Sequence, residues 1–112
     1  MRDYIEINKD LIPYQFNILL AGEWFELFVN YNKASDFFTI SLYKDDELVA
    51  TEPLILGVSM FKDVYQPEKF PAIELAPYDY SATEKRVTWD NLGETVFLTI
   101  DDEGEGDADA AI

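Results

Sequence analysis

Carboxylates are the most abundant side chains in this sequence that can do chemistry. The chain has 23 Asp and Glu residues against 8 Lys and Arg. Six of these acids lie in its last twelve residues, which contain no base: Asp101, Asp102, Glu103, Glu105, Asp107 and Asp109. Paired carboxylates can hydrolyse glycosides, and carboxylate oxygens can bind calcium.

Neither chemistry is supported by the spacing of these acids. Among so many carboxylates some pairs lie close by chance, and nearly all of them are expected at turns or on polar strand faces. The acidic tail lacks the loop pattern, with its closing bidentate glutamate, that calcium sites of this kind use. The acids therefore indicate a solvated charged surface, and the sequence predicts no catalytic residue and no metal site.

Two residue types that carry much protein chemistry are missing. The sequence contains no histidine and no cysteine. Disulfides, zinc sites built from cysteine and histidine, and catalytic triads built on histidine are therefore excluded. The sequence also contains no GxxxxGK[ST] segment and no GxGxxG segment after a strand, so no phosphate-binding loop is predicted. We expect a protein that is not an enzyme and has no cofactor.

Aromatic side chains are the second group that could form a site. Six of them are expected off the main core face: Trp24, Phe37, Tyr43, Tyr78, Tyr80 and Trp89. They could stack on a sugar, form a protein–protein interface, where aromatic residues are enriched, or make a second core face in a two-layer sandwich. Phe37 and Tyr43 share a strand face with Thr39 and Ser41, which favours that face as a docking surface.

The stretch from Tyr14 to Tyr43 has to position several of these aromatic residues, because it predicts consecutive strands. Apolar and polar residues alternate, with the period of a strand that has one exposed face, along residues 14–20, 25–31 and 38–42. The connections between these segments are too short for a parallel crossover, so neighbouring strands must be antiparallel. The sequence therefore predicts a β-meander with one apolar face.

The remaining segments add further short strands to the meander. Strands are predicted at 48–51, 73–76 and 95–100, with loops at 62–71 and 77–86. Leu54–Phe61 is apolar without a clear period and predicts a buried strand bent at Gly57. Residues 4–7 predict a short strand or an arm that pairs with another subunit. We expect an all-β fold, a small antiparallel β-sandwich or barrel over residues 1–100, followed by an acidic tail at 101–112.

The charge of the chain restricts its partners. The formal net charge is −15, and residues 1–100 alone carry 17 acids and 8 bases, a net charge of −9. Such a surface repels nucleic acid and anionic lipid and complements a basic protein surface. No apolar run approaches the ~20 residues that cross a bilayer, and Met1–Glu6 lacks the apolar segment of a secretory signal. We expect no nucleic acid, membrane or small-molecule substrate as a partner.

Several motifs, in this order and spacing, resemble those of the small baseplate plug proteins of tailed phages. They are Leu11-Ile12-Pro13, Phe16 to Phe25, Tyr31-Asn32-Lys33, Phe38 to Tyr43, Leu54 to Val58 and Trp89 to Leu98. Chains of that family are of similar length and have a proline-led strand, a glycine turn before an aromatic residue and a closing D-N-L-G strand. Each motif is common in β-hairpins; their combination over residues 11–100 carries the resemblance.

The resemblance implies a non-enzymatic structural protein of the virion, located in the tail baseplate and present in the host cytoplasm during assembly. It implies docking, in several copies, against hub and tail-tube proteins, and it supplies no catalytic residue. The acidic tail is not part of the family pattern, and we expect it to lie along a basic groove of a neighbouring subunit. The interface candidates are Phe37, Tyr43, Trp24, Tyr78, Tyr80, Trp89, Asp101, Asp102, Glu103 and Glu105.

Two other functions remain open from the residues. A strong negative charge is typical of proteins that mimic DNA and inhibit a DNA-binding enzyme. However, mimicry needs carboxylates spread along one face, whereas the densest cluster here is in the tail. The other alternative is a carbohydrate-binding module of a tail-tip receptor-binding protein, for which Trp24 or Trp89 should be exposed and flat.

Overall fold

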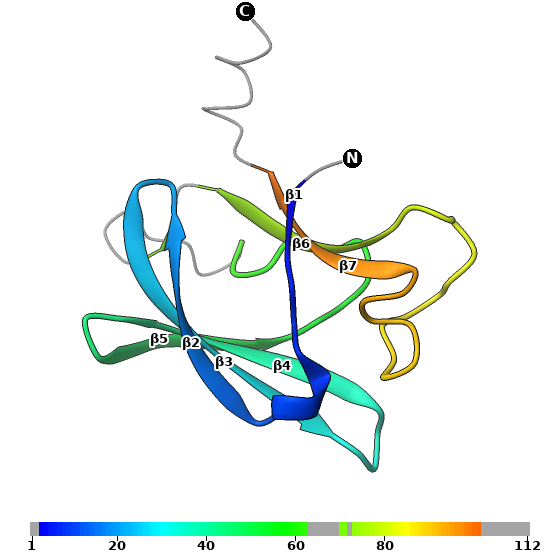
Figure 1. The fold of residues 1–112 in the computed structure, drawn as a ribbon. Coiled ribbons are helices and arrows are strands. Elements are labelled where there is room, and N and C mark those ends of the chain that lie inside the picture. Colours follow the sequence, from blue (N-terminus) through cyan, green and yellow to red (C-terminus); the bar gives the residue numbers. More distant parts are fainter. Residues whose placement is uncertain (1–2, 63–69, 72, 102–112) are drawn as a thin grey trace, which may run out of the picture.

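The chain folds into two antiparallel sheets that pack face to face (Figure 1). This computed structural model describes residues 3–62, 70–71 and 73–101. The larger sheet has the strand order β2-β3-β4-β5 and the smaller one β1-β7-β6. The strands are β1 (Asp3–Ile5), β2 (Tyr14–Leu20), β3 (Glu23–Asn32), β4 (Phe37–Lys44), β5 (Glu47–Pro53), β6 (Glu74–Asp79) and β7 (Val96–Asp101), and a 3₁₀ turn, η1 (Lys9–Leu11), follows β1. The predicted all-β sandwich is confirmed, and its sheets do not close into a barrel.

The larger sheet is the predicted meander, and two tight turns set its register. Ala21 and Gly22 join β2 to β3 with φ of 52° and 82°, and Asp45 and Asp46 join β4 to β5 with φ of 52° and 64°. Positive φ at both central residues is the geometry that matches the twist of paired strands. Leu27 consequently lies opposite Phe16 on one side and Leu42 on the other, all on the apolar face.

The core fills the space between the two sheets. Because side chains alternate across a strand, each sheet contributes one face to it. Its most deeply buried members are Phe25, Leu27 and Val29 of β3, Phe38, Ile40 and Leu42 of β4, Leu75 of β6, and Val96 and Leu98 of β7. β1 pairs with β7 of its own chain, through Asp3 opposite Ile100 and Ile5 opposite Leu98. Residues 3–5 are therefore an intramolecular strand and not an arm.

Two predictions about the second half of the chain are wrong. Leu54–Phe61 is not a bent strand but a series of turns, in which Gly57 N–H donates to the Pro77 carbonyl at 2.9 Å and Met60 N–H to the Leu75 carbonyl at 2.7 Å. The chain leaves one sheet for the other here, so Leu54, Met60 and Phe61 enter the core without an alternating period, while Ile55 and Val58 are exposed. The predicted loop at 77–86 is also partly strand, because β6 continues to Asp79.

Candidate docking surfaces

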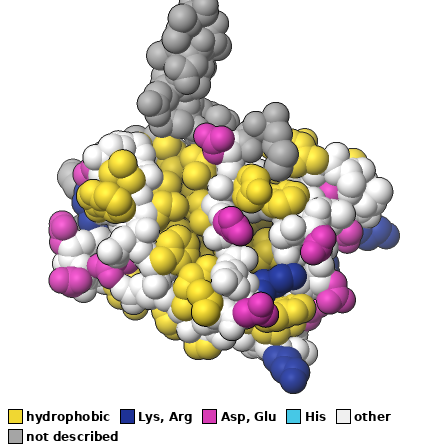
Figure 2. All heavy atoms as spheres, in the orientation of Figure 1, with side chains coloured by type: hydrophobic (Ala, Val, Ile, Leu, Met, Phe, Trp, Pro, Cys, Tyr) yellow, Lys and Arg dark blue, Asp and Glu magenta, His cyan; other side chains and the backbone are white. Residues whose placement is uncertain are grey.

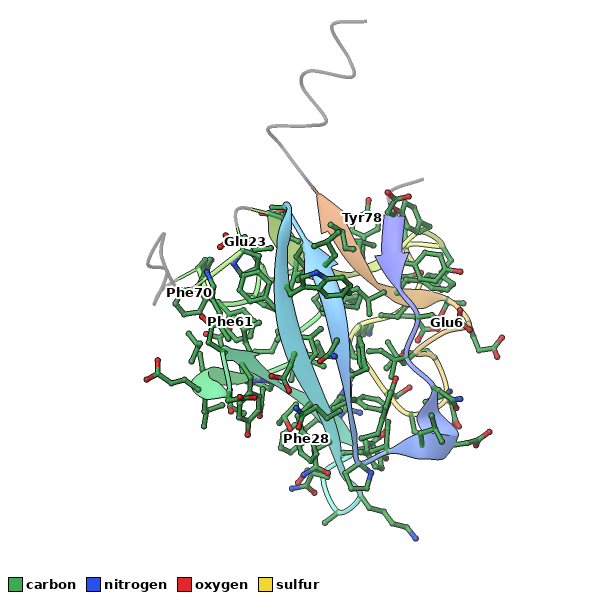
Figure 3. The ribbon with its side chains drawn as sticks, turned by 60° about the vertical axis from the view of Figure 1, so that its left-hand side comes forward. Glu6, Glu23, Phe28, Phe61, Phe70 and Tyr78 are labelled. Carbon is green, nitrogen blue, oxygen red and sulfur yellow. The ribbon has the colours of Figure 1, made fainter. Side chains whose placement is uncertain are left out.

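The outer face of the meander carries the residues that the alternation turns away from the core. Along β4, Phe37, Thr39, Ser41 and Tyr43 are all half-buried, whereas the residues between them are buried. This confirms that Phe37 and Tyr43 share a face with Thr39 and Ser41. Phe28 lies opposite Ser41 on the same face (Figure 3), and Ser41 is hydrogen-bonded to Thr51 at 2.8 Å between their hydroxyl oxygens. Phe28 is not among the residues predicted for this face.

One end of this face, which we name the hairpin patch, carries three exposed residues, Leu19, Trp24 and Leu48, together with the half-buried Tyr43. Trp24 lies opposite Leu19, and Tyr43 opposite Leu48, each pair close to one of the two tight turns. The exposed fractions are 65% for Trp24 and 53% for each of the two leucines. Such exposure of large apolar side chains in one cluster is typical of a surface that another protein covers.

Acidic residues lie at the turn end of the hairpin patch. They are Glu23, Glu26, Asp45, Asp46 and Glu47, from the two turns and the adjoining strand ends. The ammonium of Lys44 is 2.7 Å from a carboxylate oxygen of Glu23, so this base is already paired. The patch therefore combines an apolar centre with a negative rim at its turns. Figure 2 shows acidic side chains lying among apolar ones on the face that includes β1 and β2.

The outer face of the smaller sheet carries a second set of aromatic residues, which we name the aromatic band: Tyr4, Phe97, Tyr78 and Tyr80. The ring centroids are 4.8 Å apart for Tyr4 and Phe97 and 4.6 Å apart for Tyr78 and Tyr80. Phe97 and Tyr78 are cross-strand partners, which joins the two pairs. The exposed fraction is 43–44% for each tyrosine.

Only half of the aromatic band was predicted. Tyr78 and Tyr80 were among the candidates, whereas Tyr4 and Phe97 were not. The alternation of β7 contained the missing signal for Phe97, because placing Val96 and Leu98 in the core turns Phe97 outward. The position of Tyr4 in the band depends on the pairing of β1 with β7, which no local pattern in the sequence predicts.

Trp89 does not join either surface. Its ring stacks on Phe38, with centroids 5.9 Å apart and 10° between the planes, and contacts Tyr31 at 4.8 Å. The Lys9 ammonium is 5.5 Å from the Trp89 ring centroid and donates to its carbonyl. Trp89 thus packs against the core, contrary to the prediction that it lies off the core face, and its remaining exposed part lines an open cleft of about 610 Å³ beside Tyr31 and Asp36.

Asp36 connects the β3–β4 turn to the segment that carries Trp89. Its carboxylate accepts hydrogen bonds from the Tyr31 hydroxyl at 2.7 Å and from the Trp89 backbone N–H at 2.9 Å. A guanidinium nitrogen of Arg86 lies 3.4 Å from its second oxygen. These donors, Tyr31 first, hold the pKa of Asp36 below its ordinary value, and the same bond raises the pKa of Tyr31. The contacts position the core aromatic residues Tyr31 and Trp89.

Asp79 organises the turn that follows β6. One oxygen accepts from the Ser81 hydroxyl and from its backbone N–H at 2.8 Å, and the other accepts from the N–H groups of Thr83 and Glu84 at 2.9 and 2.7 Å. The Ser81 hydroxyl makes the largest contribution and, with these backbone donors, lowers the pKa of Asp79 from 3.8 to about 2.

The low pKa of Asp79 predicts a specific acid sensitivity. Because the folded state binds this proton less readily than the unfolded state, Asp79 stabilises the fold above about pH 4, and this contribution is lost as the pH falls from about 4 to about 2. Urea unfolding of Asp79→Asn between pH 2 and 5 should show a weaker pH dependence than the parent protein. Asp46→Asn, on the exposed β4–β5 turn, should keep the parent pH dependence; an equal flattening in both variants would contradict the assignment.

Other predicted site residues lie beyond the described chain. Asp101 is the last residue of β7, and Asp102, Glu103 and Glu105 lie outside the described residues. Within the described ranges, no group of three or more acidic residues is arranged to hold a metal ion. No helix in that part of the chain is long and apolar enough to cross a membrane.

Comparison with known proteins identifies the family. The family model described as "Cyanophage baseplate Pam3 plug gp18" matches residues 2–103. No curated protein and no solved structure matches the chain. The family match includes both sheets and ends just after β7, and it confirms the resemblance found in the sequence motifs. This chain therefore belongs to the cyanophage baseplate plug family and is a phage baseplate plug protein.

Proposed function

We propose that the chain is a non-catalytic subunit of the tail baseplate that docks against hub and tail-tube proteins, in several copies per virion, through the hairpin patch. The family match over residues 2–103 supports the general role, a structural plug protein in a phage tail. The observation that carries the docking proposal is the exposure of Trp24, Leu19 and Leu48 together at one end of the larger sheet.

The hairpin patch suits a binding surface because its backbone is already ordered. Trp24 is followed by Phe25, and Tyr43 is preceded by Leu42, and both of these neighbours are buried at 0–1% exposure. Strands held by such core residues need little ordering when a partner binds, which lowers the entropic cost of association. Exposed tryptophan and tyrosine residues are also enriched among those that contribute most of the binding energy of interfaces.

The negative charge beside the hairpin patch favours a basic partner surface. The acids of the two turns leave a negative rim, and its one lysine, Lys44, is paired with Glu23. A partner surface with an apolar centre and basic residues at its edge would match both features. On this basis we infer that the hub or tube surface beneath the patch is basic.

The acidic tail, of which residues 102–112 follow β7, is proposed to lie along a basic groove of a neighbouring baseplate subunit. Its charge motivates this proposal, and the tail falls almost entirely outside the family match, which ends at residue 103. Asp101 is the last residue that pairs within the small sheet, opposite Glu74.

Deleting residues 102–112 should leave the unfolding midpoint of the domain unchanged and slow association with the baseplate partner on the order of tenfold at low salt. The difference should shrink as salt is raised, because the Debye length falls to about 8 Å at physiological ionic strength. Stopped-flow mixing at 20 and 300 mM salt measures both effects. Unchanged association at low salt would contradict the role of the tail.

The proposed function is tested on the virion itself. Phage particles are purified, the abundance of the chain relative to the tail-tube protein is measured by quantitative mass spectrometry, and the tail tip is imaged by electron cryomicroscopy. The expected result is a fixed number of copies at the baseplate, with the hairpin patch against a hub or tube subunit. Absence of the chain from purified particles would overturn the proposal.

A further inference from the structure

We propose that the aromatic band and the groove beside it form a second docking surface, which binds an arginine-bearing segment of a neighbouring protein. This inference rests on the proposed docking function and adds a second partner surface to it. The band lies on the outer face of β1-β7-β6, and the hairpin patch lies on the outer face of the other sheet. The two surfaces can therefore be occupied at the same time, and the plug can bridge two neighbours.

The aromatic band is a continuous strip that crosses all three strands. Tyr4 on β1 contacts Phe97 on β7, Phe97 faces Tyr78 on β6, and Tyr78 contacts Tyr80 just beyond β6. The tyrosine rings present both an apolar surface and a polar hydroxyl, with more than two fifths of each residue exposed. Aromatic faces of this kind attract cations as well as apolar groups.

A groove of about 260 Å³ adjoins the Tyr4 end of the band. The rings of Tyr4 and Phe97 line it together with the carboxylate residues Glu6 and Glu94, both of which are exposed. Glu6 projects from the body of the protein, as Figure 3 shows. Lys9 also lines the groove; its ammonium donates to the Trp89 carbonyl and keeps its positive charge. The floor includes Gly93, whose φ of +91° forms the turn before β7.

This combination of groups matches the guanidinium of arginine. A guanidinium stacks flat on an aromatic face and can donate two parallel hydrogen bonds to one carboxylate, and it is more weakly hydrated than an ammonium. The groove is lined by an aromatic pair and by two acidic residues. A lysine would find the negative charge but not the planar contact, so arginine should bind more tightly.

The charge of the molecule argues against the other occupants. A second copy of this chain would bring another net charge of −15 to a surface that already carries Glu6 and Glu94. Phosphate groups of nucleic acid or lipid would be repelled for the same reason. A basic, arginine-bearing protein segment is the occupant that the charge complements.

The inference is tested by nuclear magnetic resonance on the full-length ¹⁵N-labelled protein. The probe is the peptide acetyl-(Ala-Arg)₃-amide, compared with peptides in which lysine or citrulline replaces arginine. We expect the largest amide shifts at Tyr4, Glu6, Gly93, Glu94 and Phe97, binding at least about threefold weaker with the lysine peptide, and no binding with the neutral citrulline peptide.

Variants separate specific binding from attraction to a negative surface. Glu6→Gln/Glu94→Gln should weaken binding of the arginine peptide on the order of tenfold. Asp45→Asn/Glu47→Gln removes the same charge at the hairpin patch and should weaken it less than about twofold. Circular dichroism confirms that each variant is folded. Equal effects of the two double variants, equal affinity for arginine and lysine, or shifts centred away from the groove would each overturn the inference.

The two proposals fail in different ways. If the arginine peptide misses the groove while the chain is found in virions with its hairpin patch covered, this inference is wrong and the proposed function stands. If the peptide binds as expected but purified particles lack the chain, the proposed function is wrong and the groove remains an arginine site.

Discussion

Replacing Phe38 with alanine is expected to lower the free energy of unfolding by about 3–5 kcal/mol, as for other fully buried aromatic residues. Phe38 has no exposed surface, and its ring lies against both Tyr31, at 4.8 Å, and Trp89, at 5.9 Å. Small domains are stable by only about 5–15 kcal/mol, so this loss would remove a large share of the total. Asp36 holds the Tyr31 hydroxyl and the Trp89 backbone N–H, which limits how far these two neighbours can move into the space.

Phe37 provides a matched control for this prediction. It is the adjacent residue on β4, but it lies half-buried on the outer face of the sheet. Phe37→Ala should cost less than half as much stability, because the ring already contacts water and leaves no closed cavity. Equilibrium urea unfolding of both variants, followed by tryptophan fluorescence, makes the comparison. Equal losses would show that the two faces of β4 are not inside and outside as described.

Replacing Trp24 with alanine is expected to weaken binding to the baseplate partner by at least about 30-fold, or about 2 kcal/mol, while leaving the fold intact. Trp24 is the most exposed of the large apolar residues of the hairpin patch, at 65%. Its ring therefore contributes little to the isolated domain, and the free energy of unfolding should change by no more than about 0.5 kcal/mol. Calorimetric titration of the chain into the purified hub and tail-tube assembly measures the loss.

Leu11→Ala is the control for the docking experiment. Leu11 is exposed to 56%, but it lies in η1 and not in the hairpin patch. The Leu11→Ala variant should bind the assembly with the affinity of the parent protein, because the side chain that it removes lies outside the proposed contact. If Trp24→Ala also binds normally, the hairpin patch is not the surface that docks.

The local sequence pattern was sufficient to predict the strands of the larger sheet and their antiparallel order. Residues 14–44 alternate with a period of two, and their turns contain residues that accept positive φ, such as Gly22. These features involve only neighbours along the chain, so the antiparallel order and the division into inner and outer faces could be predicted from the residues alone. Placing Phe37 and Tyr43 on one outer face followed directly from this pattern.

The second sheet and its surface depended on contacts between residues far apart in the chain. β1 and β7 are separated by about ninety residues, and their pairing brings Tyr4 to Phe97. The sequence predicts Trp89 at the surface. Its packing against the core depends on Asp36, more than fifty residues earlier, which accepts a hydrogen bond from the Trp89 backbone N–H. The segment 54–61 is predicted as a strand because a short apolar run is compatible with a buried strand and equally with a crossover between sheets.

The sequence by itself thus determined the fold class, the meander, the negative charge and the family, because alternation, short turns, composition and motif order are all properties of the linear chain. The tertiary structure alone decided which aromatic residues share a surface, since a strip such as Tyr4, Phe97, Tyr78 and Tyr80 exists only when β1, β7 and β6 lie side by side. Its members come from both ends of the chain, and cross-strand register, which no local periodicity encodes, brings them together.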